Sequence, residues 1–221
     1  MENTTKFFDA ISNGDLSRVN SLLAENLSLA SARNKDGISA ILISLYQQQR
    51  NIAACLLAKK PELDIFDAAG TGEINKLRSL LDNDSTLANA QAADGARPLH
   101  LACFFSQTDA ARLLLKHGAQ TDIAVTAFGG VFALHSAAAS RSTDIIQILL
   151  ESGADPNTTQ NGGWTALHAA AKHGDVAIAT LLLEHGADQG IKTEDGTTAR
   201  QLLSDDSPQA IRDLLDSGEV F

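Results

Sequence analysis

Three histidines recur at nearly constant spacing, and they are the first residues in this sequence that could do chemistry. His100, His135 and His168 lie 35 and 33 residues apart. Imidazole nitrogens are common zinc ligands, but each must lie about 2 Å from the ion. Helices that pack side by side are about 8–10 Å apart. Histidines on successive stacked elements cannot reach one ion, so we predict structural hydrogen bonds and no metal site.

The remaining reactive side chains do not form a recognisable catalytic set. No serine lies in a G-x-S-x-G elbow, where a strained turn would expose a nucleophile. The glycine pairs at 129–130 and 162–163 lack the following Lys-Ser/Thr and the preceding strand of a phosphate-binding loop. Asp205 and Asp206 are neighbours in a loop rather than carboxylates that face each other across a cleft. We therefore expect no enzymatic activity and no cofactor.

Residues 163–188 show which elements must position these histidines. The sequence there predicts a turn, a helix, a tight turn, a second helix and a final turn. Thr165 and Asp175 can cap the two helices, because their side-chain oxygens accept orphan backbone N–H groups. Gly174 and Gly186 can adopt the left-handed conformation that ends each helix. Two short antiparallel helices leave an apolar flank on each side, so this pair requires neighbours built in the same way.

The neighbours are present in the sequence. The dipeptide Leu-His begins at 99, 134 and 167, and Gly-Ala begins at 118, 153 and 186. A period near 33 residues with an L-H-x-A core and a G-A-D end resembles the ankyrin repeat, and RPLHLA at 97–102 resembles the family's T-P-L-H-x-A opening. The resemblance is specific over 94–188 and looser, but in register, elsewhere. It implies an all-α solenoid of about seven helix-turn-helix units, joined by short β-hairpins that we call fingers.

The expected array is a single domain over residues 1–221. Its units are 1–35 (an N-terminal capping unit), 36–60, 61–93, 94–126, 127–159, 160–192 and 193–221 (a C-terminal capping unit). The matched positions Ile41 and Ile65 are only 24 residues apart, so we predict that the finger between the second and third units is absent. Pro61 is expected at the start of the next helix, where its missing N–H has no cost.

Two departures from the family pattern affect the predicted contacts. Arg97 and Phe132 replace the opening threonine, so a Thr-to-His side-chain hydrogen bond is expected only between Thr165 and His168. Arg141 replaces the glycine between the helices of one unit. A left-handed arginine costs about 1–2 kcal/mol, so Arg141 is either a tolerated substitution at a surface turn or is kept for a contact.

Composition and charge argue against several classes of function. The chain has 17 basic and 27 acidic side chains, a net charge of −10. Nucleic acids and anionic membranes are bound by clustered Lys and Arg, so we expect neither as a partner. The acidity weakly favours a partner with a basic face, although acidity also keeps an isolated protein soluble.

The cysteines and the start of the chain bear on its location. Cys55 and Cys103 fall in different predicted helices and suggest no disulfide framework, so a reducing compartment is expected. Residues 1–10 lack a signal-peptide pattern. No run of about 18 apolar residues occurs, so we expect no membrane span. The expected location is cytoplasmic.

The family resemblance also implies where a partner binds. Partners of ankyrin-repeat proteins usually contact the finger tips and the exposed positions of the first helix of each unit. At those positions this sequence places its one Trp and its one Tyr, together with several Phe residues. The expected partner-binding residues are Tyr46, Phe104, Phe105, Phe128, Val131, Arg141, Trp164, Lys172 and His173. The alternative for Phe104, Phe105 and Phe132 is that the ring packs inward against the next unit.

Taken over its full length, the chain resembles a bacterial stand-alone ankyrin-repeat protein, which implies a cytoplasmic adaptor or regulator. We therefore predict a monomeric interaction module that binds an unidentified protein partner. Its stacked helices would hold the aromatic side chains in place before binding, which limits the ordering entropy lost. Two alternatives stay open. One is a small-molecule-binding or enzyme-accessory protein with a pocket between residues 128–130 and Trp164, and the other is an exported, host-directed effector.

Overall fold

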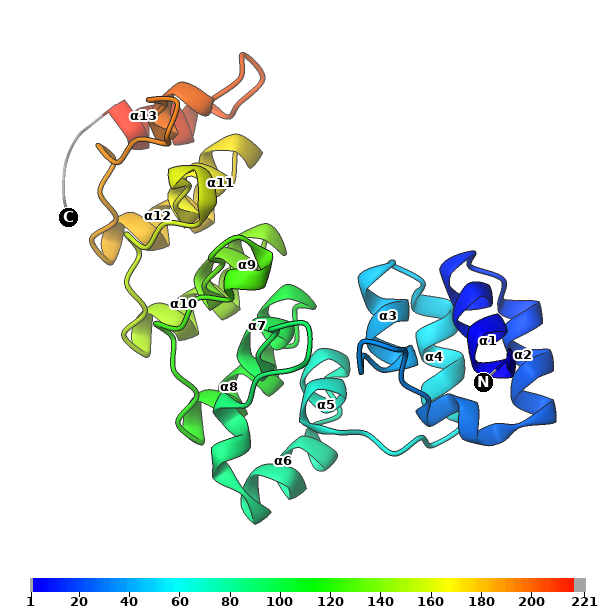
Figure 1. The fold of residues 1–221 in the computed structure, drawn as a ribbon. Helices are drawn as coiled ribbons and strands as arrows, with labels where there is room; N and C mark the ends of the chain where they lie inside the picture. The colour runs from blue at the N-terminus through cyan, green and yellow to red at the C-terminus, as the bar shows by residue number, and fades with distance from the viewer. Residues whose placement is uncertain (1, 217–221) are drawn as a thin grey trace.

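Pairs of short helices stacked one behind another make up the fold (Figure 1). The computed structural model describes residues 2–216. Its α-helices are α1 (Glu2–Ser12), α2 (Leu16–Glu25), α3 (Ala40–Tyr46), α4 (Arg50–Ala58), α5 (Ile65–Thr71), α6 (Ile74–Asn83), α7 (Pro98–Phe104), α8 (Thr108–Lys116), α9 (Ala133–Ala139), α10 (Thr143–Glu151), α11 (Ala166–His173), α12 (Val176–Glu184) and α13 (Gln209–Asp216). The 3-10 helices are η1 (Leu27–Ser31), η2 (Ser85–Asn89), η3 (Thr126–Phe128), η4 (Asn161–Gly163) and η5 (Ala199–Leu202).

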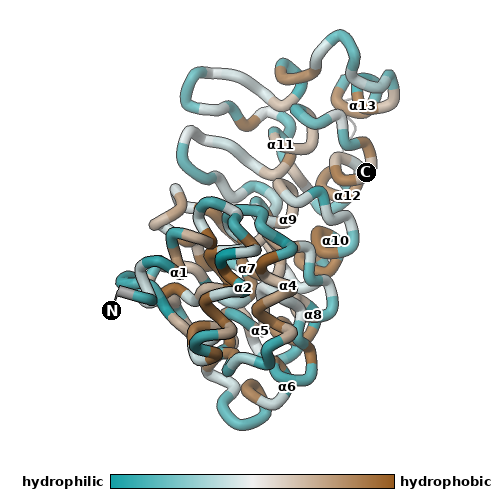
Figure 2. Tube along the Cα trace, turned by 90° about the vertical axis from the view of Figure 1, so that its right-hand side faces the viewer, coloured by the Kyte–Doolittle hydropathy of each residue, from teal (hydrophilic) through white to brown (hydrophobic). Residues whose placement is uncertain are grey.

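This arrangement confirms the predicted all-α solenoid. In the last pair the short helix η5 takes the place of a first α-helix and contacts α11 and α13. Residues 1 and 217–221, which belong to the expected terminal units, lie outside the described part of the chain. Along the trace, apolar residues lie mainly on the helices, whereas the turns and fingers are mostly hydrophilic (Figure 2).

The ends of α11 and α12 show why the sequence folds locally into such pairs. The side chains of Thr165 and Asp175 each accept a hydrogen bond from the backbone N–H three residues further on, both at 3.4 Å. Gly174 has φ of 63° and Gly186 has φ of 86°, both left-handed. These observations confirm the predicted caps. Between residues 2 and 216, no helix has the length and apolar character needed to cross a bilayer.

Short hairpins join most of the pairs. Isolated antiparallel bridges close them at Arg33–Ser39, Val125–Val131, Gln160–Trp164 and Lys192–Thr198. The turn at 92–96 is closed by a backbone hydrogen bond of 2.8 Å from Ala92 to Ala96. Residues 59–64, between α4 and α5, carry no such bridge. The predicted absence of this finger is therefore confirmed.

The start of α5 differs from the prediction for Pro61. Helix α5 begins at Ile65, four residues after the proline. Its N-cap is Asp64, whose side chain accepts from the backbone N–H groups of Phe66 and Asp67, each at 2.9 Å. Pro61 instead lies in the non-helical connection. The prediction for Pro61 is wrong because a stronger capping residue follows it.

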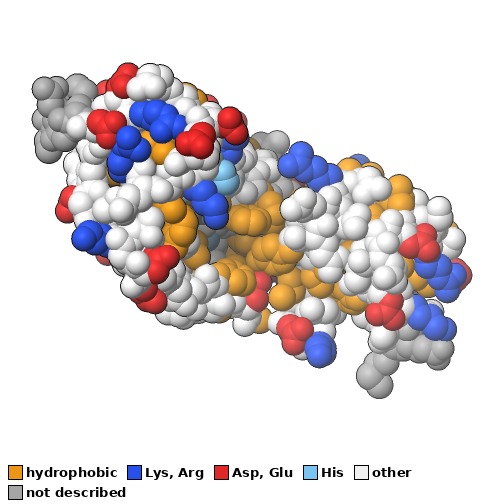
Figure 3. Space-filling view, turned by 90° about the horizontal axis from the view of Figure 1, so that it is seen from above, with side chains coloured by type: hydrophobic (Ala, Val, Ile, Leu, Met, Phe, Trp, Pro, Cys, Tyr) orange, Lys and Arg blue, Asp and Glu red, His pale blue; other side chains and the backbone are white. Residues whose placement is uncertain are grey.

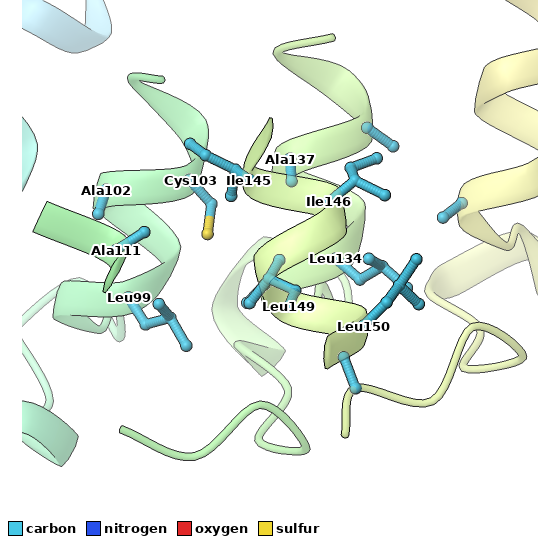
Figure 4. Packing of buried hydrophobic residues seen from close by; sticks show 14 of the residues in the cluster. Leu99, Ala102, Cys103, Ala111, Leu134, Ala137, Ile145, Ile146, Leu149 and Leu150 are labelled. Carbon is cyan, nitrogen blue, oxygen red and sulfur yellow. The ribbon is translucent and has the colours of Figure 1, made fainter. Parts of the chain in front are cut away.

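The hydrophobic core is divided at the connection between α4 and α5. One buried cluster runs from Phe7 to Leu63 and belongs to α1–α4, and another runs from Ile65 to Leu215. Within the second cluster, side chains of α7 and α8 face those of α10, including Ile145 and Leu149 (Figure 4). At the division, α3 contacts α5, but α4 and α6 make no comparable contact. Figure 1 shows the resulting separation between the two groups of helices.

A polar network joins the two groups of helices where the finger is missing. The Arg33 guanidinium lies 2.7 Å from Asp64 and 3.3 Å from Asp67, and the Ser39 hydroxyl donates a hydrogen bond to Asp67. Asp67 is only 1% exposed. Burial and the neighbouring Asp64 charge raise the pKa of Asp67 to about 6, although Ser39 and Arg33 oppose this shift. We call Arg33, Ser39, Asp64 and Asp67 the junction network.

Candidate partner-binding surface

The three repeated histidines fix the fingers to the helices. Each Nε2 atom contacts a backbone carbonyl of the next finger: His100 with Val131 (3.0 Å), His135 with Trp164 (3.1 Å) and His168 with Thr197 (3.2 Å). A carbonyl can only accept, so Nε2 carries the proton in each ring. Burial lowers the pKa of all three imidazoles, to about 4 for His100. The predicted structural role is confirmed.

The opposite nitrogen of each ring depends on the residue three positions earlier. The Thr165 hydroxyl lies 2.8 Å from His168 Nδ1, which confirms the predicted side-chain pair. His135 Nδ1 accepts from the Phe132 backbone N–H at 3.3 Å. His100 Nδ1 is buried without a partner, because Arg97 offers no hydroxyl and its backbone N–H makes no hydrogen bond to the ring. No group of three or more potential metal ligands occurs within residues 2–216.

An apolar cavity of about 290 Å³ lies where three first helices meet two turns. Helices α3, α7 and α9, the turn at 92–96 and the finger at 125–131 supply its walls. The lining residues are Tyr46, Ala96, His100, Leu101, Phe104, Val125, Phe128, Val131 and Ser136. Phe104 and Phe128 are each 49% exposed, which is unusual for so large an apolar side chain. Hydrophobic side chains gather in a hollow on this face (Figure 3).

Neighbouring aromatic rings hold the cavity wall in place. The centroid of the Phe105 ring lies 5.1 Å from that of Phe104, which it meets edge to face, and 5.7 Å from that of Tyr46. Phe105 is half-buried, and it packs so close to Gly70 that a Cβ there would lie 3.3 Å from the ring. The Tyr46 hydroxyl donates to Asp94 at 3.0 Å, and burial together with that carboxylate raises the pKa of the phenol. Phe105 therefore packs inward and supports Phe104, which stays open to solvent.

A second depression of about 660 Å³ adjoins the cavity and shares Tyr46 and Phe104 with it. Its other lining residues are Leu45, Gln48, Arg50, Phe105, Ser106, Gln107, Ala139 and Ser140. These residues come from the C-terminal ends of α3, α7 and α9, from the turns that follow them and, for Arg50, from the start of α4. The two hollows together extend the surface along the first helices.

The remaining expected residues lie one step further along the stack. Lys172 is exposed, and its Nζ lies 5.3 Å from the centroid of the half-buried Trp164 ring. Arg141 is left-handed, with φ of 55°, and its Nε lies 3.1 Å from the Asp175 carboxylate of the next pair. Arg141 therefore makes an intramolecular contact, while its left-handed conformation is shared by Gln48 and Ser106 at the matched turns. His173 is exposed beside Lys172.

The nine expected residues thus fall into two groups. Tyr46, Phe104, Phe128 and Val131 line the cavity, with Phe105 behind them, whereas Arg141, Trp164, Lys172 and His173 do not line it. The cavity lies on the Tyr46 side of Phe128, not between Phe128 and Trp164 as the small-molecule alternative predicted. Sequence reasoning missed Leu101 and Ser136 as lining residues. Their signal is simple, since each occupies the variable position of the L-H-x-A segment.

Comparisons with known proteins agree with this geometry. A sequence model described as ankyrin repeats (3 copies) matches residues 7–124 and 65–160. Another, described as ankyrin repeats (many copies), matches residues 134–199. The chain belongs to the ankyrin-repeat family. Ankyrin repeats are generally protein–protein interaction modules.

Individual ankyrin-repeat proteins match only part of the chain. Ankyrin repeat and SOCS box protein 3 of Bos taurus is 38% identical over 93 residues, which are 42% of this chain and 18% of that protein. An ankyrin repeat protein of Rickettsia felis is 30% identical over 127 residues, 53% of this chain and 42% of that protein. The chain therefore spans less than half the length of these relatives.

Proposed function

We propose that this protein is a non-enzymatic interaction module, an adaptor or regulator, that binds a protein partner on the face lined by α3, α7 and α9. The observation that carries the proposal is the apolar cavity with the half-exposed rings of Phe104 and Phe128 at its rim. Large aromatic side chains in a preformed hollow are typical of binding hot spots. We further propose a cytoplasmic location, because the thiols of Cys55 and Cys103 are free, and a monomeric state.

Burial of the two rings supplies a driving force for association. Full burial of a phenylalanine side chain is worth about 1.5–3 kcal/mol, so covering the exposed half of each ring contributes roughly 1 kcal/mol. Contacts of Phe104 with Phe105, and of Phe105 with Tyr46, limit the entropy that must be lost on binding. Arg141, Trp164, Lys172 and His173 would extend the contact beyond the cavity.

A cross-linking experiment tests this proposal. Partners are captured from cells with the full-length protein and with a variant that combines Phe104→Ala and Phe128→Ala. Leu27→Ala is the matched control, because Leu27 is a 58% exposed apolar residue on η1, away from the cavity. We expect the control to retain its partners and the double variant to lose them, with unchanged helical circular dichroism. Equal capture by the double variant would refute the proposal.

The size of the cavity supports a second candidate, small-molecule binding. About 290 Å³ is near the lower end of typical ligand pockets, roughly 300–1,000 Å³. Tyr46, His100 and Ser136 supply the few polar groups of an otherwise apolar wall. A metabolite that raises the melting temperature of the wild type, but not that of Phe128→Ala, would favour this candidate.

A further inference from the structure

We propose that the segment bound on this face presents one bulky apolar side chain to the cavity and one carboxylate to Lys172. This inference rests on the proposed function and specifies the chemistry of the partner. It runs against the net charge of −10, which by itself favours a basic partner. We nevertheless infer a carboxylate, because few of the charged side chains among the described residues lie on the face with the cavity.

Formal charge is nearly absent from the face that carries the cavity. Helices α3, α7 and α9 contain no Asp, Glu, Lys or Arg, and α11 contains only Lys172. In α5 the one charged residue is the buried Asp67. The fingers at 125–131 and 160–164 contain no charged residue either. The turn at 92–96 has only Asp94, which is half-buried and accepts from Tyr46.

Exposed carboxylates of this part of the chain lie instead on the second helices and, beyond α11, in the finger with Glu194 and Asp195. Asp109 on α8, Asp144 and Glu151 on α10 and Glu184 on α12 are all exposed. The second helices pack in a row of their own behind the first helices, α8 beside α10 and α10 beside α12. A basic segment would therefore find no carboxylate among the described residues that line the two hollows.

Lys172 on α11 is one of two exposed cations among the described residues that border this face, the other being Arg50 in the second depression, and Lys172 is the one that an aromatic ring holds in position. In the described chain no carboxylate lies within 4.0 Å of its ammonium group, which is placed 5.3 Å from the Trp164 centroid. A cation over an aromatic face keeps its charge and is held in position. His173, also exposed, lies next to it at the end of α11. The arrangement favours an approaching carboxylate.

The positions of the helices set the spacing that the partner needs. Lys172 lies on α11, one step from α9 and two steps from α7. Adjacent packed helices are about 8–10 Å apart, so the ammonium group and the cavity are separated by roughly 10–20 Å. An extended chain rises about 3.3 Å per residue. The apolar residue and the carboxylate are therefore about three to six residues apart in an extended segment.

Fluorescent synthetic peptides test the inference on the full chain. Each peptide has about twelve residues, with one Phe and one Asp placed three to six positions apart in a Gly/Ser background. Matched peptides carry Lys instead of Asp. We expect the best-spaced Asp peptide to bind about three- to tenfold more tightly than its Lys partner at low salt, and the difference to shrink at high salt. Lys172→Gln should remove the difference.

Two control variants separate this inference from the proposed function. Lys116→Gln makes the same change in net charge at an exposed site on α8 and should leave the preference for Asp intact. Phe128→Ala should weaken the Asp and Lys peptides alike. Equal binding of the two peptides by the wild type, or a preference that survives Lys172→Gln, would overturn the carboxylate contact. In either case, weaker binding by Phe128→Ala would still support the aromatic site. Failure of every peptide to bind would overturn the inference, and the cross-linking experiment would still decide the proposed function.

Discussion

The step from α3–α4 to α5–α6 differs from the later steps of the stack. Between later pairs, first helices pack on first helices and second helices pack on second helices, and from α7 onward a histidine contacts the next finger. At the earlier step only α3 and α5 make substantial contact, and no finger joins them. The junction network supplies polar contacts in its place.

The comparison shows that the histidine contact requires a finger, whereas a finger does not require the histidine. The positions matched to the histidine are Leu42 in α3, which no finger follows, and Phe66 in α5, which is followed by the turn at 92–96. Both contribute to a small apolar cluster with Ala96 and Leu101 that connects the two larger cores. Where the repeat loses its hairpin, the chain exchanges a repeated hydrogen bond for a local apolar contact and a salt bridge.

The largest expected difference between the two regions concerns apolar packing. Leu182 is fully buried between pairs of the C-terminal stack. Leu182→Ala should lower the free energy of unfolding by about 2–5 kcal/mol, because it leaves a cavity in a continuous core. Urea unfolding of the full chain measures the change. A loss below about 1 kcal/mol would mean that the stack relaxes around the site.

Acid should affect the two regions in opposite directions. His100 has a pKa of about 4 in the folded chain, below its usual 6.5. Its contribution to stability is complete above about pH 6.5 and is lost as the pH falls towards 4, by on the order of 3 kcal/mol. Asp67 has the opposite effect on stability. Its pKa is raised to about 6, so its protonation as the pH falls removes the cost of a buried charge.

Amide hydrogen exchange at pH 7 and pH 4.5 measures this difference region by region. Protection should fall more in α7–α10 than at the start of α5. His100→Gln removes the titrating group but keeps a side-chain N–H donor, so it should flatten the pH dependence in α7–α10. An unchanged slope in that variant would contradict the assignment to His100.

The junction network can be broken at one residue. Arg33→Ala leaves the buried Asp67 without its cation, and we expect a loss of about 1–3 kcal/mol, reduced because Arg33 and Asp64 are both partly exposed. The matched control is Arg200→Ala, which removes an exposed ion pair with Asp216 and should have a much smaller effect. Chemical unfolding compares the two variants, and equal losses would show that the junction pair is an ordinary surface pair.

The smallest expected effect concerns a turn in the C-terminal stack. Ser106 is left-handed, with φ of 58°, at the position where Gly174 stands in a later pair. Ser106→Gly should stabilise the protein by about 1 kcal/mol, because glycine adopts this conformation without strain. Ser152→Gly is the control, since Ser152 has φ of −88° and glycine offers no relief there. Thermal unfolding would contradict the expectation if both variants behaved alike.

Repetition in the sequence is enough to predict the stack. Each L-H-x-A segment and each Gly-Ala segment specifies its own caps and turns, as Thr165, Gly174 and Asp175 do. The shortened spacing before α5 predicts the missing finger for the same reason. Contacts that occur once have no such signal. The pairing of Arg33 with Asp64 and Asp67 joins residues more than 30 positions apart, and it does not recur elsewhere in the sequence.

The candidate site was predictable in its residue types but not in its shape. Tyr46, Phe104 and Phe128 stand at positions that face outward, and their hydrophobicity marks them. Their meeting in one cavity depends on how α3 approaches α7 across the junction, which no local pattern specifies. For Pro61, the general preference of proline for a helix start gave a wrong prediction, because the helix begins after the cap at Asp64.

One consequence follows from the position of the cavity. Tyr46 reaches it from the α1–α4 group, whereas Phe104 and Phe128 reach it from the other group. A partner bound there would contact both groups at once and hold them together where α3 and α5 meet. Because such a partner binds only the folded stack, its binding would stabilise the contact between α3 and α5, the step that has no finger.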